Sequence, residues 1–118
     1  MYARDNAATA GLAQQLPTGE VVEAATTALR MLADATRLRL LYLLRDAEFD
    51  VGSLAAATGA ARPAVSQHLA KLRLAGLVTV RRHGRRALYT ARGGHVRRLV
   101  NEILAAAEHH LTGAPDHD

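Results

Sequence analysis

The sequence predicts a small, mainly helical domain with one β-hairpin, and three observations lead to this fold class. With 118 residues, the chain has room for one domain with a modest core. Apolar residues recur at helical spacing in several separate segments. The stretches 77–80 and 87–90 are rich in β-compatible residues and enclose a turn that contains glycine. Together these observations predict helices followed by a hairpin and one further helix.

The first two predicted helices follow an irregular start. Residues 1–19 lack apolar periodicity and include Pro17, so we expect a flexible N-terminal arm. From Glu20 to about residue 33, helical spacing returns, carried by Val21, Val22, Ala25, Leu29 and Leu32. Asp34 is suited to cap a second helix, because its carboxylate can accept hydrogen bonds from the free amides of the first turn. That helix carries Leu38, Leu41 and Leu44.

Two shorter helices are predicted next. Asp50 is suited to cap a helix that carries Val51, Leu54 and Ala55, and Gly59 is suited to end it with a positive φ. Pro63 fits the first turn of the following helix, whose buried stripe is Val65, Leu69 and Leu72 and which Gly76 ends. Two short helices joined by a tight turn are the sequence form of a helix-turn-helix.

The last part of the chain predicts a wing and a long helix. Residues 77–80 and 87–90 would pair around His83 and Gly84, which favour a tight hairpin turn. Gly93 and Gly94 then precede an amphipathic helix from about His95 to Leu111. The predicted architecture is therefore a winged helix-turn-helix over residues 20–111, with residues 112–118 as a C-terminal tail.

Charge is distributed very unevenly along the chain. The formal net charge is +4, yet residues 51–101 contain nine arginines and one lysine without a single carboxylate. A folded basic surface usually faces a polyanion, and the phosphate backbone of nucleic acid is the most common one. Coding bias would account for arginine in place of lysine, but it does not account for the missing acids. Double-stranded DNA is therefore the predicted partner.

The second helix of the helix-turn-helix is predicted to read the DNA. With Val65, Leu69 and Leu72 inward, Gln67 and Lys71 point outward. A glutamine can bond adenine with both amide atoms, and lysine can neutralise a phosphate. His68 lies near the buried stripe, so packing and DNA contact are equally weighted there. The predicted DNA-binding residues are Arg62, Pro63, Ser66, Gln67, His68, Lys71, Arg81, Arg82, Arg85 and Arg86.

Several segments also carry a family resemblance. These are LADATRLRLL at 32–41, VSQHLAKL at 65–72, AGLV at 75–78 and an arginine-rich wing that ends at Tyr89. In this order they resemble the ArsR/SmtB family of bacterial metalloregulatory repressors, and the likeness spans residues 20–111. The resemblance implies a homodimer held through the terminal helices, which binds a palindromic operator and loses affinity when metal binds. It also implies that the regulated genes include a metal exporter.

The last helix carries candidate metal ligands. At 1.5 Å per residue, His95 and His109 lie on nearly the same face but about 21 Å apart, too far to share one ion within a chain. Antiparallel pairing of two such helices about a two-fold axis near residues 101 and 102 would bring His95 of one subunit to Glu108 and His109 of the other. The alternative is a solvated helix end, where the helix dipole favours histidine.

The resemblance narrows the choice of metal. His95, Glu108 and His109 match ligand positions of the family's nickel and cobalt sensors. The zinc sensors carry an aspartate two residues before the first histidine and a His-x-x-His pair, where this chain has Gly93 and Ala106. No cysteine is present, which argues against thiolate sensing of arsenic, lead or cadmium. We therefore expect Ni(II) or Co(II) as the effector, with Zn(II) as an alternative and with His110 and His117 as additional donors.

Three functions remain open at this point. The first is a metal-responsive repressor, the second is an ArsR-type repressor that answers to another signal or to none, and the third is an architectural DNA-binding protein. An enzyme is not expected, because Ser66 and His68 point in different directions on one helix and no glycine-rich phosphate loop is present. Without a signal peptide or a long apolar run, we expect a cytoplasmic protein with no membrane partner.

Overall fold

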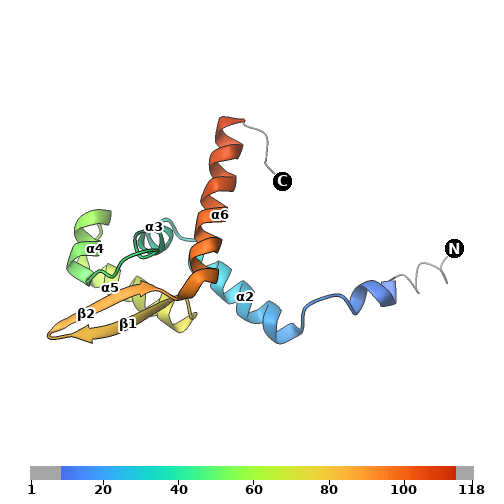
Figure 1. Ribbon diagram of the computed structural model, residues 1–118, viewed down its shortest axis with the longest axis horizontal. Coiled ribbons are helices and arrows are strands. Elements are labelled where there is room, and N and C mark those ends of the chain that lie inside the picture. The colour runs from blue at the N-terminus through green and yellow to red at the C-terminus, as the bar shows by residue number, and fades with distance from the viewer. Residues whose placement is uncertain (1–8, 114–118) are drawn as a thin grey trace.

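The computed structural model describes residues 9–113, and its elements follow the predicted order (Figure 1). The helices are α2 (Gly19–Leu32), α3 (Ala35–Leu43), α4 (Val51–Thr58), α5 (Arg62–Leu74) and α6 (Gly93–Thr112), and the strands are β1 (Val78–His83) and β2 (Arg86–Ala91). Within the described part, no helix is both long and apolar enough to cross a membrane. The winged helix-turn-helix prediction is confirmed.

The predicted helix boundaries are set by local hydrogen bonds. The Asp34 carboxylate accepts from the Arg37 amide at 2.9 Å, and the Asp50 carboxylate accepts from the Ser53 amide at 2.8 Å. Both acids therefore cap the helices for which the sequence assigned them. Gly59 ends α4 at φ +74°, a conformation that costs glycine little. These caps therefore set where α3 and α4 begin and where α4 ends.

The core lies where α3, α4 and α5 meet the hairpin. Val65, Leu69 and Leu72 of α5 are fully buried, as the inward stripe predicted. They pack in one cluster with leucines 40, 41, 44 and 54, and Val100 attaches α6 to the same cluster. Because its apolar side is committed to this core, α5 must present its opposite side outward.

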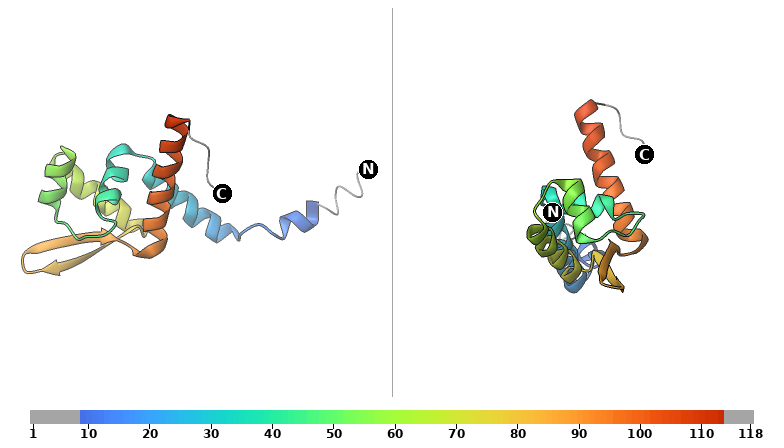
Figure 2. Two further views of the ribbon diagram at one scale, coloured as in Figure 1. Left: turned by 45° about the horizontal axis from the view of Figure 1, so that its top comes forward. Right: turned by 90° about the vertical axis from the view of Figure 1, so that its left-hand side faces the viewer.

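The hairpin is longer than the sequence predicted. Pairing runs from Val78 with Ala91 to His83 with Arg86, so the turn is formed by Gly84 and Arg85 alone. Gly84 has φ +64°, as a tight two-residue turn with glycine in its first central position requires. The arginines continue the backbone ladder although they bury little surface, which an apolar pattern cannot signal. In Figure 2 the hairpin tip and the N-terminal segment lie at opposite ends of the molecule.

The two terminal helices reach beyond this core. No residue of α2 is buried, and Val100 is the one fully buried residue of α6. Residues 9–13 are also helical, although the sequence predicted a flexible arm over residues 1–19, and they extend away from the domain (Figure 1). Residues 1–8 of the predicted arm and 114–118 of the predicted tail lie outside the described residues. The described chain measures 66 × 36 × 22 Å, so it is far from compact.

Candidate nucleic-acid interface and metal-ligating residues

The outward side of α5 is polar at its start. Ser66, Gln67 and Lys71 are exposed, as are Arg62 and Pro63 in the first turn. The residue before the helix, Ala61, supplies no side-chain cap. The first amides of α5 therefore remain open to an external acceptor, and a phosphate group is well suited to that position. These residues are accessible to DNA, and their groove contacts stay a prediction.

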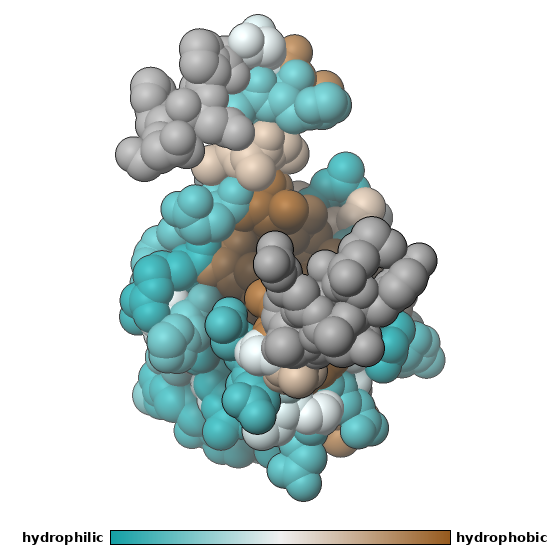
Figure 3. Space-filling view, turned by 90° about the vertical axis from the view of Figure 1, so that its right-hand side faces the viewer, coloured by the Kyte–Doolittle hydropathy of each residue, from teal (hydrophilic) through white to brown (hydrophobic). Residues whose placement is uncertain are grey.

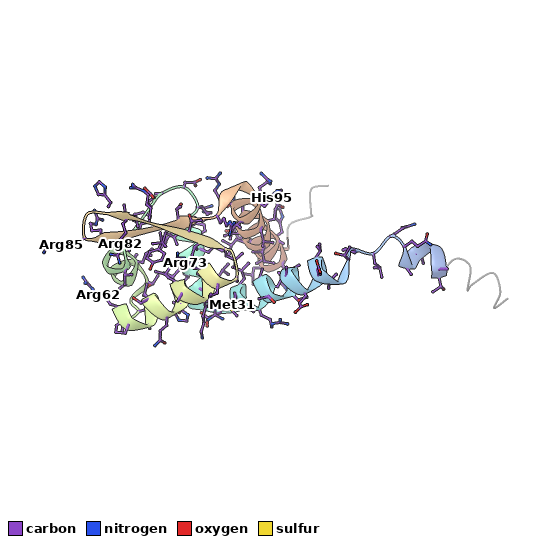
Figure 4. All side chains as sticks on the ribbon, turned by 90° about the horizontal axis from the view of Figure 1, so that it is seen from below. Met31, Arg62, Arg73, Arg82, Arg85 and His95 are labelled. Atoms are coloured by element: carbon purple, nitrogen blue, oxygen red, sulfur yellow. The ribbon has the colours of Figure 1, made fainter. Side chains whose placement is uncertain are left out.

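Arg62 is held at the junction of α4 and α5. A Cβ atom added at Gly52 would lie 2.8 Å from Nη2 of Arg62, so the guanidinium rests directly over the α4 backbone. Figure 4 shows Arg62 at the same end of the domain as Arg82 and Arg85 of the hairpin. The sequence predicted Arg62 as a DNA contact, but it gave no sign that Gly52 makes room for its side chain.

The four hairpin arginines fall into two groups. Arg81 donates two hydrogen bonds to Glu48, at 2.6 and 2.7 Å, and Arg86 donates one to Asp50 at 3.0 Å. Arg82 and Arg85 have no carboxylate partner among the described residues. The register explains why Arg81 and Arg86 share one face of the hairpin while Arg82 points to the other, because neighbouring residues of a strand point to opposite faces. Arg85 lies in the turn, outside both strands. Arg82 and Arg85 are left as the wing cations available to phosphate.

These contacts also hold two acids in the charged form. The hydrogen bonds from Arg81 lower the pKa of Glu48. The pKa of Asp50 falls to about 2, mainly because the Ser53 amide and hydroxyl donate to it and secondarily because Arg86 does. Asp50 thus caps α4 and anchors the wing at once. The block 51–101 contains no acid, yet Glu48 and Asp50 just before it neutralise two of its arginines, which the charge count along the chain did not predict.

His68 faces α3 and lies half-buried. Its Nδ1 atom lies 3.3 Å from Nη1 of Arg37, and Nε of the same arginine donates to the carbonyl oxygen of Met31 in the last turn of α2. Arg37 therefore joins the end of α2 to the middle of α5. Of the two interpretations left open for His68, this contact favours packing over DNA contact.

The predicted metal ligands stay apart within one chain. His95 is exposed near the start of α6 and its Nδ1 lies 3.0 Å from Nη2 of Arg98. Glu108, His109 and His110 lie at the other end of the helix, about 20 Å away at 1.5 Å per residue. Among the described residues, no three side chains of histidine, aspartate or glutamate gather where they could hold a metal ion. His117 lies outside the described residues.

Exposed apolar side chains run along both terminal helices. Val21, Val22 and Leu29 of α2 are between 45 and 58% exposed, and Leu99 and Ile103 of α6 are 37 and 51% exposed. Seen from the side toward which the N-terminal segment extends, these helices border an apolar surface (Figure 3). A contiguous patch of this kind marks an interaction surface in most proteins.

Comparisons with known proteins identify the family. Residues 34–80 match the family described as "Bacterial regulatory protein, arsR family". Over 88 residues the chain is 50% identical to the transcriptional regulator KmtR of Mycobacterium tuberculosis, which covers 75% of this chain and 68% of that protein. The chain belongs to the ArsR family.

Other ArsR-family relatives agree with this assignment. The regulator NmtR of the same organism is 39% identical over 88 residues, covering 75% of this chain and 73% of its own. The solution structure of the homodimeric winged helix-turn-helix DNA-binding domain of Mb0332 from Mycobacterium bovis superimposes with a TM-score of 0.76 at 32% identity, covering 84% of this chain and 92% of that domain. This ArsR-family chain is therefore a transcriptional regulator and not an enzyme.

Proposed function

We propose that this chain represses transcription as a homodimer on operator DNA, and that Ni(II) or Co(II) bound between the two α6 helices releases it. The observation that carries the proposal is that two exposed apolar residues of α6 and its candidate ligand pairs have nearly the same midpoint along the helix. The exposed residues Leu99 and Ile103 are centred on position 101. The ligand pairs His95 with Glu108 and His95 with His109 are centred at 101.5 and 102. One two-fold axis would therefore bury the apolar residues and bring the ligands together.

The residues present fit such an ion. Imidazole and carboxylate donors suit nickel, cobalt and zinc. The contact between His95 and Arg98 uses Nδ1, which leaves Nε2 of His95 for a metal ion. His110 and, from the C-terminal tail, His117 would add donors for a six-coordinate ion. Because ligands would come from both subunits, metal binding would act directly on the angle between the two recognition helices.

The expected effect on DNA binding follows from linkage. If DNA and metal favour different subunit arrangements, a coupling of about 1 to 3 kcal/mol weakens operator binding roughly 5- to 150-fold. A repressor that answers to Zn(II), to another signal or to none is the principal alternative, and it keeps the same DNA surface. An architectural protein would keep the charge but lose the preference for an operator.

Fluorescence anisotropy tests the proposal. A labelled fragment from the region upstream of the chain's own gene is titrated with the metal-free protein, and Ni(II), Co(II) or Zn(II) is then added. We expect release by nickel or cobalt for the wild type and no release for His95→Ala/His109→Ala. His83→Ala is the control for the loss of an exposed histidine outside α6, and each variant is compared with its own metal-free affinity, because His83 lies in the wing. Operator binding that no metal disturbs would refute the effector, and equal affinity for random DNA would refute the repressor.

A further inference from the structure

The N-terminal segment of the described chain is helical yet covers nothing. All residues from 9 to 26 are exposed. Residues 9–13 form a helix that continues in turns to Leu16, whose amide donates to the Ala13 carbonyl at 3.3 Å. Within it, Leu12 is 62% and Leu16 71% exposed. A helix this short is unstable in water unless its apolar side packs against another part of the protein or of a partner. We therefore expect this segment to pack against an apolar surface.

An apolar groove lies on the other side of α6. It has a volume of about 740 Å³ and is enclosed by α3, the end of α4 and the C-terminal half of α6. Leu38, Tyr42 and Leu104 form part of its lining, while Arg39, Thr58 and Glu108 supply polar atoms. Figure 1 shows α3 and α4 on the side of α6 that faces away from the N-terminal segment.

The direction of the N-terminal segment indicates that it fills the groove of a second subunit and not the groove of its own chain. α2 carries the segment away from its own groove by the length of a 14-residue helix, about 21 Å. The proposed dimer, on which this inference rests, places the partner on that same side. By two-fold symmetry each segment then runs across the other subunit, and the contact occurs twice.

The two surfaces also match in chemistry. Residues 9–16 contain no charged side chain, and their large apolar residues are the two exposed leucines. Gln14 and Gln15 carry amides that can pair with the hydroxyl, guanidinium and carboxylate groups of the groove. We infer that residues 9–16 of one subunit dock in the α3–α4–α6 groove of its partner. Because Glu108 lines this groove, the segment covers one of the proposed metal ligands.

Cross-linking tests the inference, since the natural chain has no cysteine. One chain carries Leu12→Cys or Leu16→Cys, and it is mixed with a second chain that carries Ala57→Cys in the groove. Ala56→Cys is the matched control, because Ala56 is the adjacent exposed alanine of α4 and does not line the groove. We expect mild oxidation to give a disulfide-linked pair with Ala57→Cys, at least several-fold more than with Ala56→Cys. Equal yields would overturn the inference.

Two further measurements separate this inference from the proposed dimer. Light scattering gives the mass of the full chain in solution, and a monomer would refute the dimer itself. If the full chain is a dimer, removal of residues 1–16 should raise its dissociation constant by roughly tenfold or more, because the burial of two leucines per subunit is lost. It should also speed the reaction of Ala57→Cys with a thiol reagent. A dimer that changes in neither respect would refute the docked segment and leave the dimer standing.

Discussion

Arg82 and Arg81 are neighbours on one strand, and the structure predicts opposite roles for them in DNA binding. Arg82 has no carboxylate partner among the described residues, whereas Arg81 donates two hydrogen bonds to Glu48. Each phosphate contact contributes about 0.9 to the slope of log K against log salt concentration. A dimer with Arg82→Ala loses two such contacts, so its slope should fall by about 1.8.

The difference is large enough to measure by anisotropy. Between 50 and 200 mM salt, wild type should lose about tenfold more affinity than Arg82→Ala, because a slope change near 1.8 acts over a fourfold range of salt. The control is Arg81→Ala/Glu48→Ala, which removes the ion pair without changing the net charge. We expect it to keep the wild-type slope. A slope reduced as much in this control as in Arg82→Ala would refute the division of the wing arginines.

Three other perturbations follow from the site. Since the pKa of Asp50 is lowered to about 2, its contribution to stability is complete above the unfolded pKa near 4 and disappears as the pH falls through 2. Acid unfolding followed by circular dichroism should therefore lose this pH dependence in Asp50→Asn, and an unchanged profile would contradict it. Gly52→Ala places a Cβ atom 2.8 Å from Nη2 of Arg62, so it should displace that side chain and weaken operator binding several-fold while leaving thermal stability nearly unchanged. His68→Ala should lower the ratio of operator affinity to random-DNA affinity. His68→Gln should largely restore this ratio, because the glutamine oxygen can still accept a hydrogen bond from Arg37. Equal ratios in the two variants would indicate that the His68 side chain has a steric role only.

The features that the sequence predicted well are local. Asp34 and Asp50 lie three residues before the amides that they accept from, and the stripe of Val65, Leu69 and Leu72 repeats within one helix. Such spacings are fixed by helix geometry alone, so no knowledge of the remaining fold is needed. The same holds for Gly59, whose positive φ is a property of one residue.

The features that the sequence missed depend on register between distant segments. Glu48 and Arg81 are 33 positions apart, and they meet because Phe49 bridges to Tyr89 and aligns the α3–α4 loop with the hairpin. A charge count along the chain places Arg81 in a basic block. It cannot show that Glu48, which lies outside that block, neutralises this arginine in the fold. His68 is a similar case, since only the packing of α5 on α3 decides that it faces Arg37.

The proposed metal ligands illustrate a third limit, because one chain alone cannot bring them together. A helix of 20 residues separates His95 from His109 whatever the rest of the chain does, so a single subunit cannot assemble them into one site. Leu99 and Ile103 of the same helix support the place proposed for a second copy, because their midpoint falls within one position of the ligand midpoint. A two-fold axis displaced by one turn along α6 would still bury leucine and isoleucine, but it would separate the donors of the two subunits by about 11 Å, twice the helical pitch. The position of the dimer axis therefore tests the proposed metal site in one direction. An axis away from residues 101 and 102 would rule the site out, whereas an axis at these residues would bring the donors together and leave metal binding to be measured directly.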